Sequence, residues 1–184
     1  MSRQFWQESL SWATGSGTAI ASSTTETILF PNVTVPANYM QDGRALRITA
    51  YGRWGATGTP TYTWAIRWGG VGGTVLASSG VTTVSAQTAA QWKIDAILQT
   101  RSNGSTGTIF TQGMAIMGTA TAPTFGTVAN YGVVDFMGSA GIATPAAVTV
   151  DLTADTALSL TIDFSASDAA NAVTGHIYLL ESLN

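Results

Sequence analysis

Strand-length segments in which apolar and polar residues alternate occur along most of this chain, and this pattern constrains its fold more than any other feature. Residues 46–54, 62–68 and 92–99 place apolar side chains at every second position. Because successive side chains of a β-strand point to opposite faces of a sheet, each segment is typical of a strand with one buried face. No stretch carries a convincing helical pattern. The sequence therefore predicts an all-β protein.

Turn signals separate these segments from further strands. Asn103-Gly104 indicates a hairpin between residues 92–99 and 108–117, and the loop Gly69–Gly73 follows the strand at 62–68. Residues 118–147 are rich in Gly, Ala, Thr and Pro, so we expect long loops there around one short strand. The remaining strands are expected at residues 27–30, 33–35, 74–77, 108–117, 131–137, 158–164 and 173–179. This set predicts an antiparallel β-sandwich, of simple sandwich or jelly-roll type.

The chain has 184 residues, enough for one sandwich with a sizeable core and short for two. Residues 26–184 are expected to form this domain, and residues 1–25 an extended N-terminal arm. The arm carries Phe5, Trp6, Leu10 and Trp12 among Ser, Thr, Gly and Gln residues, with no sustained period. Large apolar side chains in such a segment need a surface to pack on. We expect these four residues to bind a neighbouring subunit; packing on the chain's own domain is the alternative.

The scarcity of ionisable groups excludes several classes of function. Charged residues make up 9% of the chain, with one histidine and no cysteine. Enzymes need convergent titratable side chains, so no catalytic residue is expected, and no cofactor or metal site either. Seven Lys and Arg at a net charge of -3 argue against nucleic-acid binding. The N-terminus lacks a signal-peptide pattern, and no apolar run is long enough for a membrane span.

Three groups of residues have a functional and a structural interpretation. Trp54, Trp64 and Trp68 could stack on sugars, but they share parity with apolar strand positions, so we expect them in the core. His176 has no partner motif, and no catalytic role is assigned to it. Four aspartates could bind Ca²⁺, but their spacing fits no calcium loop, so turn or edge positions are expected for Asp151, Asp155, Asp163 and Asp168.

Four short motifs follow one another from residue 24 onward: TTETILF at residues 24–30, VPAN at 35–38, RALRITAYG at 44–52 and IRWGG at 66–70. In this order they resemble the jelly-roll structural proteins of tailed bacteriophages. The resemblance implies a jelly-roll virion protein, commonly trimeric, that serves as a capsid decoration protein, head fibre, minor tail protein or fibre tip. The chain matches no catalytic motif of that group, so the resemblance implies no functional residue.

We therefore expect a non-enzymatic virion protein, assembled in the host cytoplasm, that decorates and reinforces the capsid as a homotrimer. Its partners would be copies of itself and the major capsid protein or other virion proteins. A charge content of 9%, far below the roughly 25–35% recommended for exposed surfaces, favours a surface covered by neighbours. One alternative is a minor tail or fibre-tip protein that binds the host surface, although the chain lacks the heptads or repeats of a shaft. Another is a carbohydrate-binding module or glycan hydrolase, which an exposed aromatic row or a carboxylate pair would support.

Overall fold

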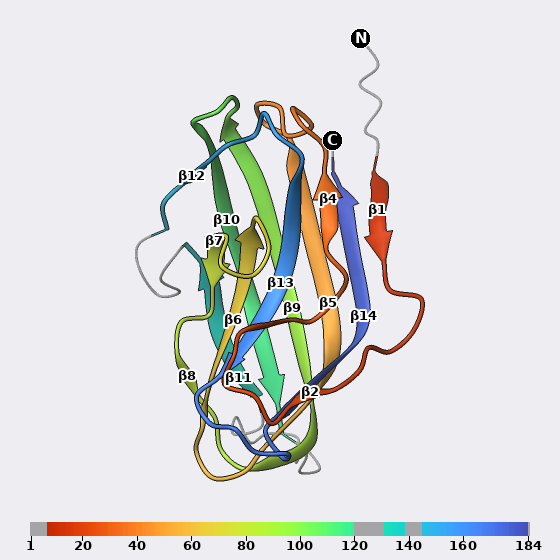
Figure 1. Cartoon of the computed structure of the whole chain (residues 1–184), viewed down its shortest axis with the longest axis vertical. Helices are drawn as coiled ribbons and strands as arrows, with labels where there is room; N and C mark the ends of the chain where they lie inside the picture. The colour runs from red at the N-terminus through yellow and green to blue at the C-terminus, as the bar shows by residue number, and fades with distance from the viewer. Residues whose placement is uncertain (1–6, 120–130, 139–144, 184) are drawn as a thin grey trace.

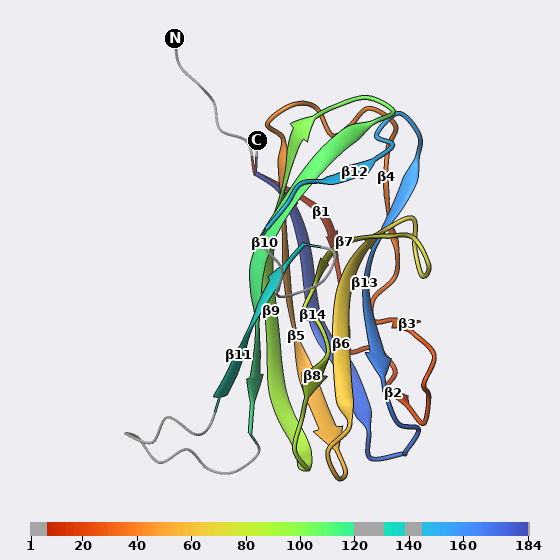
Figure 2. The same cartoon turned by 90° about the vertical axis from the view of Figure 1, so that its left-hand side faces the viewer.

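Two antiparallel sheets packed face to face make up the fold, as the two layers in Figures 1 and 2 show. The structure is a computed structural model that describes residues 7–119, 131–138 and 145–183. The large sheet contains β1 (Glu8–Trp12), β2 (Ile20–Ala21), β5 (Ala45–Ala56), β9 (Gln87–Ser102), β10 (Gly107–Gly118), β11 (Tyr131–Met137), β12 (Val148–Val150) and β14 (Ala172–Ser182). The small sheet contains β3 (Thr27–Ile28), β4 (Val33–Val35), β6 (Thr61–Trp68), β7 (Thr74–Ser78), β8 (Thr82–Thr83) and β13 (Thr156–Phe164).

The strands of each sheet follow an order that differs from their order in the chain. The large sheet runs β1-β14-β5-β9-β10-β11, with β2 also paired to β14 and β12 to β10. The small sheet runs β3-β13-β6-β7, with β4 also paired to β13 and β8 to β6. Within the described residues, no helix has the length and hydropathy needed to cross a membrane.

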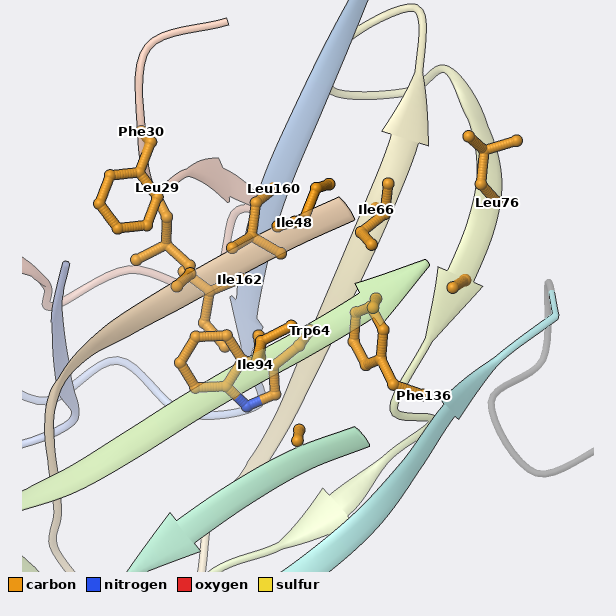
Figure 3. Close-up of a cluster of buried hydrophobic side chains, with 14 of the residues drawn as sticks. Leu29, Phe30, Ile48, Trp64, Ile66, Leu76, Ile94, Phe136, Leu160 and Ile162 are labelled. Carbon is orange, nitrogen blue, oxygen red and sulfur yellow. The ribbon is translucent and has the colours of Figure 1, made fainter. Parts of the chain in front are cut away.

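The core lies between the two sheets and is built from the apolar positions of the alternating segments. In β6, for example, Tyr62, Trp64, Ile66 and Trp68 are all buried. The ring of Trp64 meets that of Trp92 from the opposite sheet at a centroid distance of 4.8 Å. Figure 3 shows Trp64 and Phe136 among the aliphatic side chains of this cluster. Burial of Trp54, Trp64 and Trp68 confirms the expectation that these residues fill the core and form no exposed sugar-binding platform.

The expected turns have a clear backbone basis. Asn103-Gly104 lies between β9 and β10, where Gly104 adopts a φ of +102° that favours glycine. The N–H of Gly107 donates to the Gly104 carbonyl at 3.1 Å and closes this loop. Strand β11 confirms the short strand expected at residues 131–137, while much of the surrounding loop segment lies outside the described residues.

Three of the four aspartates accept hydrogen bonds in loops, as their structural interpretation predicts. Asp151 accepts from both the hydroxyl and the backbone N–H of Thr153, and these hydrogen bonds lower the pKa of its carboxyl. Asp168 accepts from the N–H of Ala170 at 2.8 Å, and Asp155 from the N–H of Ala37 at 2.8 Å. No group of three or more potential metal ligands occurs among the described residues.

Candidate interaction face

The N-terminal arm contributes edge strands to the large sheet. Strand β1 pairs antiparallel with β14, with Trp12 opposite Leu179, and β2 pairs with the beginning of β14. Leu10 is half-buried and packs against the core, whereas Trp12 is 62% exposed. Phe5 and Trp6 lie outside the described residues. Contact of the arm with a neighbouring subunit stays a prediction, as does the domain division at residue 25.

Hydrogen bonds beyond the strand ladder hold the arm against β14. The N–H of Ala13 donates to the Tyr178 carbonyl at 3.0 Å, and the N–H of Gly17 to the Gly175 carbonyl at 2.8 Å. The side chain of Gln7 donates to that of Glu181 at the other end of β1. The exposed indole of Trp12 therefore sits on a backbone that is fixed from both sides.

Trp12 belongs to a larger group of exposed apolar side chains. Seven large hydrophobic residues are exposed among the described residues, and two of them, Val71 and Val81, lie in loops. The other five are exposed on strands of the large sheet: Trp12, Ile97, Met114, Val133 and Ile177. We call the surface formed by these five residues and their neighbours the outer face.

The strand register places four of these side chains at two flanks of the outer face, and Ile97 on β9 between them. Trp12 and Ile177 lie on β1 and β14 at one flank. At the other, Met114 on β10 is opposite Asp135 on β11, and Val133 is opposite Ile116. Cross-strand neighbours on one face lie close together, so each flank presents two exposed apolar side chains on adjacent strands, with Asp95 and Asp135 beside Met114.

Apart from Ile97, the centre of the outer face is polar and carries charges of both signs. Lys93 Nζ lies 3.6 Å from the Asp95 carboxylate and 5.5 Å from the centroid of the Tyr51 ring. Arg47 on β5 is in register with Glu181 on β14. Because these pairs balance, a protein that covers the outer face meets little net charge at its centre.

Two adjoining hollows open on the same side of the large sheet, where β5 ends and β9 and β14 begin. Their volumes are about 470 and 340 Å³, and both are lined by Arg53, Ala89 and His176. Tyr51 and Ile177 line the first hollow, and Thr174 lines the second. We call the two hollows together the Arg53 cleft.

Sequence reasoning missed four of the five exposed residues of the outer face. A signal for two of them exists in the sequence. Ile97 interrupts the polar positions of β9, and Ile177 stands next to the buried Tyr178, so each adds an apolar residue where alternation requires a polar one. Such interruptions of the pattern mark apolar residues on a solvent face.

Comparison with known proteins identifies no family for this chain. No protein-family model matches it, and neither does any curated protein. Among solved structures, it is similar to the CBM2 module of the evolved Dit of Lactobacillus casei BL23 phage J-1. The TM-score is 0.37 at 9% identity, with 99% of each chain covered.

Proposed function

We propose that this protein is a non-enzymatic structural component of a bacteriophage virion that decorates and reinforces the capsid as a homotrimer. The outer face is the observation that carries the proposal, because it gathers five of the seven exposed large hydrophobic residues described. Exposed apolar patches of this kind mark contact surfaces between proteins. The ordered motifs between residues 24 and 70, which resemble phage jelly-roll proteins, supply the biological setting.

We interpret the sandwich as a jelly roll, the fold of that resemblance. In a jelly roll the first strand lies beside the last, and the chain passes repeatedly between two four-stranded sheets. The orders β1-β14-β5-β9 and β3-β13-β6-β7 support this interpretation. Strands β10, β11 and β12 are then an insertion that widens the large sheet and carries the Met114 and Val133 flank.

Reinforcement follows from covering the outer face in the assembled particle. Full burial of a large apolar side chain contributes about 1.5–3 kcal/mol, and these five are 39–62% exposed. Covering them therefore contributes roughly 4–8 kcal/mol in all, which offsets part of the entropy lost on association, about 4–15 kcal/mol. Because the two apolar flanks lie on different strands, the flank of one subunit can pack on the other flank of the next. A head-to-tail contact of this type closes into a ring when its rotation is threefold.

Sedimentation of the isolated protein and of two variants tests the assembly step. We expect a trimer at micromolar concentration that Val133→Thr together with Met114→Gln dissociates. Val81→Thr is the matched control, because Val81 is 75% exposed in a loop away from the outer face. A wild-type protein that is monomeric at every concentration, and that does not trimerise on particles, would overturn the trimer.

Virions that lack this protein test its role in the particle. We expect them to adsorb to host cells at the normal rate and to release their genome at a lower temperature, because contacts made only in the shell raise the barrier to its rupture. Normal thermal stability combined with lost adsorption would instead support a minor tail or fibre-tip protein that binds the host surface. The Arg53 cleft is the observation that favours this second candidate.

A further inference from the structure

The Arg53 cleft is lined by residues at the end of β5 and at the beginnings of β9 and β14. These strand ends lie at the lower end of the sandwich in Figure 1. Arg53 itself is near the end of β5, between β9 on one side and β14 on the other. The same three residues, Arg53, Ala89 and His176, separate and line both hollows. A ligand that spans the two hollows would therefore contact all three.

Two β-bulges on either side of β5 shape this cleft. In β14, Gly175 is opposite Gly52 and Ile177 is opposite Tyr51, so His176 is an extra residue without a partner in the ladder. In β9, the register with β5 shifts between Trp54 and Ala56, and Ala89 lies in the shifted segment. Bulges commonly occur beside functional sites, where they redirect a side chain.

The bulge in β9 carries a strained backbone. Ala89 has a φ of +52°, a left-handed conformation that is unfavourable for a residue with a Cβ atom. Arg53 Nη1 donates a hydrogen bond to the Ala89 carbonyl at 3.3 Å and helps to hold it there. Strained residues of this type gather at ligand-binding sites, because a preorganised site requires the chain to be held in one conformation.

The floor of the cleft is rigid. The indole N–H of the buried Trp92 donates to the carbonyls of Arg53 at 3.2 Å and Thr174 at 3.3 Å. Gly52 lets the backbones approach so closely that a Cβ atom there would lie 1.9 Å from the Thr174 oxygen. The Arg53 backbone is thus fixed from beneath, which lowers the entropy lost when its side chain binds a ligand.

The cleft lining has the chemistry of an anion site. Neither hollow is lined by an Asp or Glu, although the whole chain has a net charge of -3. The Arg53 guanidinium has five N–H donors, and its planar fork suits carboxylate and phosphate oxygens. His176 Nδ1 lies 2.8 Å from Ser16 Oγ, which fixes the ring and leaves Nε2 as its other polar atom.

The rest of the lining suits a polyhydroxyl compound. Side-chain hydroxyls of Thr88 and Thr174 and the amide of Gln91 supply donors and acceptors on both sides of Arg53. Tyr51 gives the first hollow an aromatic surface for the apolar face of a sugar ring. Two hollows of about 470 and 340 Å³ also exceed the space that a simple inorganic anion needs.

We propose that the Arg53 cleft binds an anionic sugar, with the carboxylate or phosphate group held between Arg53 and His176. Uronic acids and sugar phosphates share this chemistry. The inference goes beyond the structural role proposed above and does not depend on where in a virion the protein sits.

Amide resonances of the ¹⁵N-labelled full-length chain, titrated with four small probes, test the site. D-Glucuronate or glucose 6-phosphate should shift the resonances of residues 89–91 and 174–177, and the more effective of the two identifies the anionic group. Glucose and inorganic phosphate should have much weaker effects, because each lacks one half of the ligand. Arg53→Gln should raise the Kd at least about tenfold, the loss expected for charge-assisted hydrogen bonds.

Arg101→Gln is the matched control. Arg101 is exposed on the same sheet, with its guanidinium 5.0 Å from the centroid of the Phe110 ring, and the change removes the same charge outside the cleft. A similar loss of affinity in both variants would overturn the proposal, because binding would then follow overall charge. If glucose binds as tightly as the anionic sugars, the anionic requirement is wrong. If inorganic phosphate binds as tightly as they do, the sugar requirement is wrong. If none of the four probes shifts these resonances, the site itself is wrong.

Sedimentation of Arg53→Gln separates this result from the proposed assembly. We expect the variant to keep the oligomeric state of the wild-type protein, since the Ile97, Met114 and Val133 side chains remain in place. Loss of sugar binding with assembly intact supports the site independently of the trimer. A protein that is monomeric in solution and on particles, yet binds glucuronate through Arg53, would contradict the proposed trimer and leave the sugar site supported.

Discussion

Substitution of Gly52 by alanine should destabilise the protein strongly, because the backbones of β5 and β14 leave no space for a methyl group. A Cβ atom at residue 52 would lie 1.9 Å from the Thr174 carbonyl oxygen and 2.7 Å from two carbons of the Trp92 ring. The nearest obstacle is backbone, so no side-chain rotation relieves it. The two strands must separate, and the Trp92 ring must also move away from the carbonyls that accept its N–H.

The two consequences can be added as an order of magnitude. Overpacking of a dense core costs about 1–3 kcal/mol. Loss of the hydrogen bonds from Trp92 Nε1 to the Arg53 and Thr174 carbonyls leaves a buried N–H without a partner, which costs a further 1–3 kcal/mol or so. We expect Gly52→Ala to lower the free energy of unfolding by about 3–5 kcal/mol, a large part of the roughly 5–15 kcal/mol typical of a folded domain.

Urea unfolding followed by tryptophan fluorescence, at one fixed protein concentration, measures this difference. Gly15→Ala is the control, because a Cβ atom at residue 15 meets nothing within 4 Å. That variant should be as stable as the wild type or slightly more stable. Alanine lowers the conformational entropy of the unfolded chain, which stabilises the folded state by about 0.4–1 kcal/mol. A Gly52→Ala protein within about 1 kcal/mol of the wild type would refute the close approach of β5 and β14.

Three further predictions concern other parts of the fold. Glu26→Gln should lower the free energy of unfolding in urea by about 1–2 kcal/mol, because the Glu26 carboxylate accepts hydrogen bonds from Arg67 at 2.5 and 2.7 Å and from Thr161 at 2.5 Å. Asp95→Asn is the comparison, because the Asp95 pair with Lys93 is more exposed and its atoms are 3.6 Å apart. It should change the free energy of unfolding by less than about 1 kcal/mol. Phe136→Ala should cost about 3–5 kcal/mol in the same assay if β11 is anchored in the core, and a near-zero effect would contradict that anchoring. Burial raises the pKa of Tyr62 and Tyr178 above the ordinary 10.0, so the unfolded chain loses these protons first and stability should fall as pH rises above 10. Absorbance at alkaline pH should show both tyrosines ionising only on unfolding, and their titration in the folded protein would contradict the prediction.

The major strands could be predicted from the sequence because their signals are local. β5 alternates strictly and β6 alternates except at the buried Ala65, so the sequence indicates both the strand and the side that is buried. The hairpin between β9 and β10 could be predicted from Asn103-Gly104 alone, since its backbone conformation is favoured by those two residues. In each case, the residues that determine the structure are neighbours in the chain.

The edge strands and the Arg53 cleft depend on residues far apart in the sequence. The segment ESLSW becomes β1 because β14 offers it an unpaired edge, and its own alternation, over four residues only, is too short to predict a strand. Likewise, the bulges at Ala89 and His176 arise from the register of two strands with β5, which no local pattern specifies. The residues that line the cleft could therefore be identified only once the sheet was assembled.

The position of β14 between β1 and β5 affects how the chain folds. Ser9 pairs with Glu181, so the large sheet cannot close on this side until almost all of the described chain has left the ribosome. Contacts between such distant residues slow folding, because the entropy of closing a long loop is lost before any pairing compensates for it. During synthesis, the free edges of β1 and β5 can pair with other nascent chains. Arg47 and Arg53 on β5 place positive charge beside one of these edges, which discourages such pairing until β14 arrives.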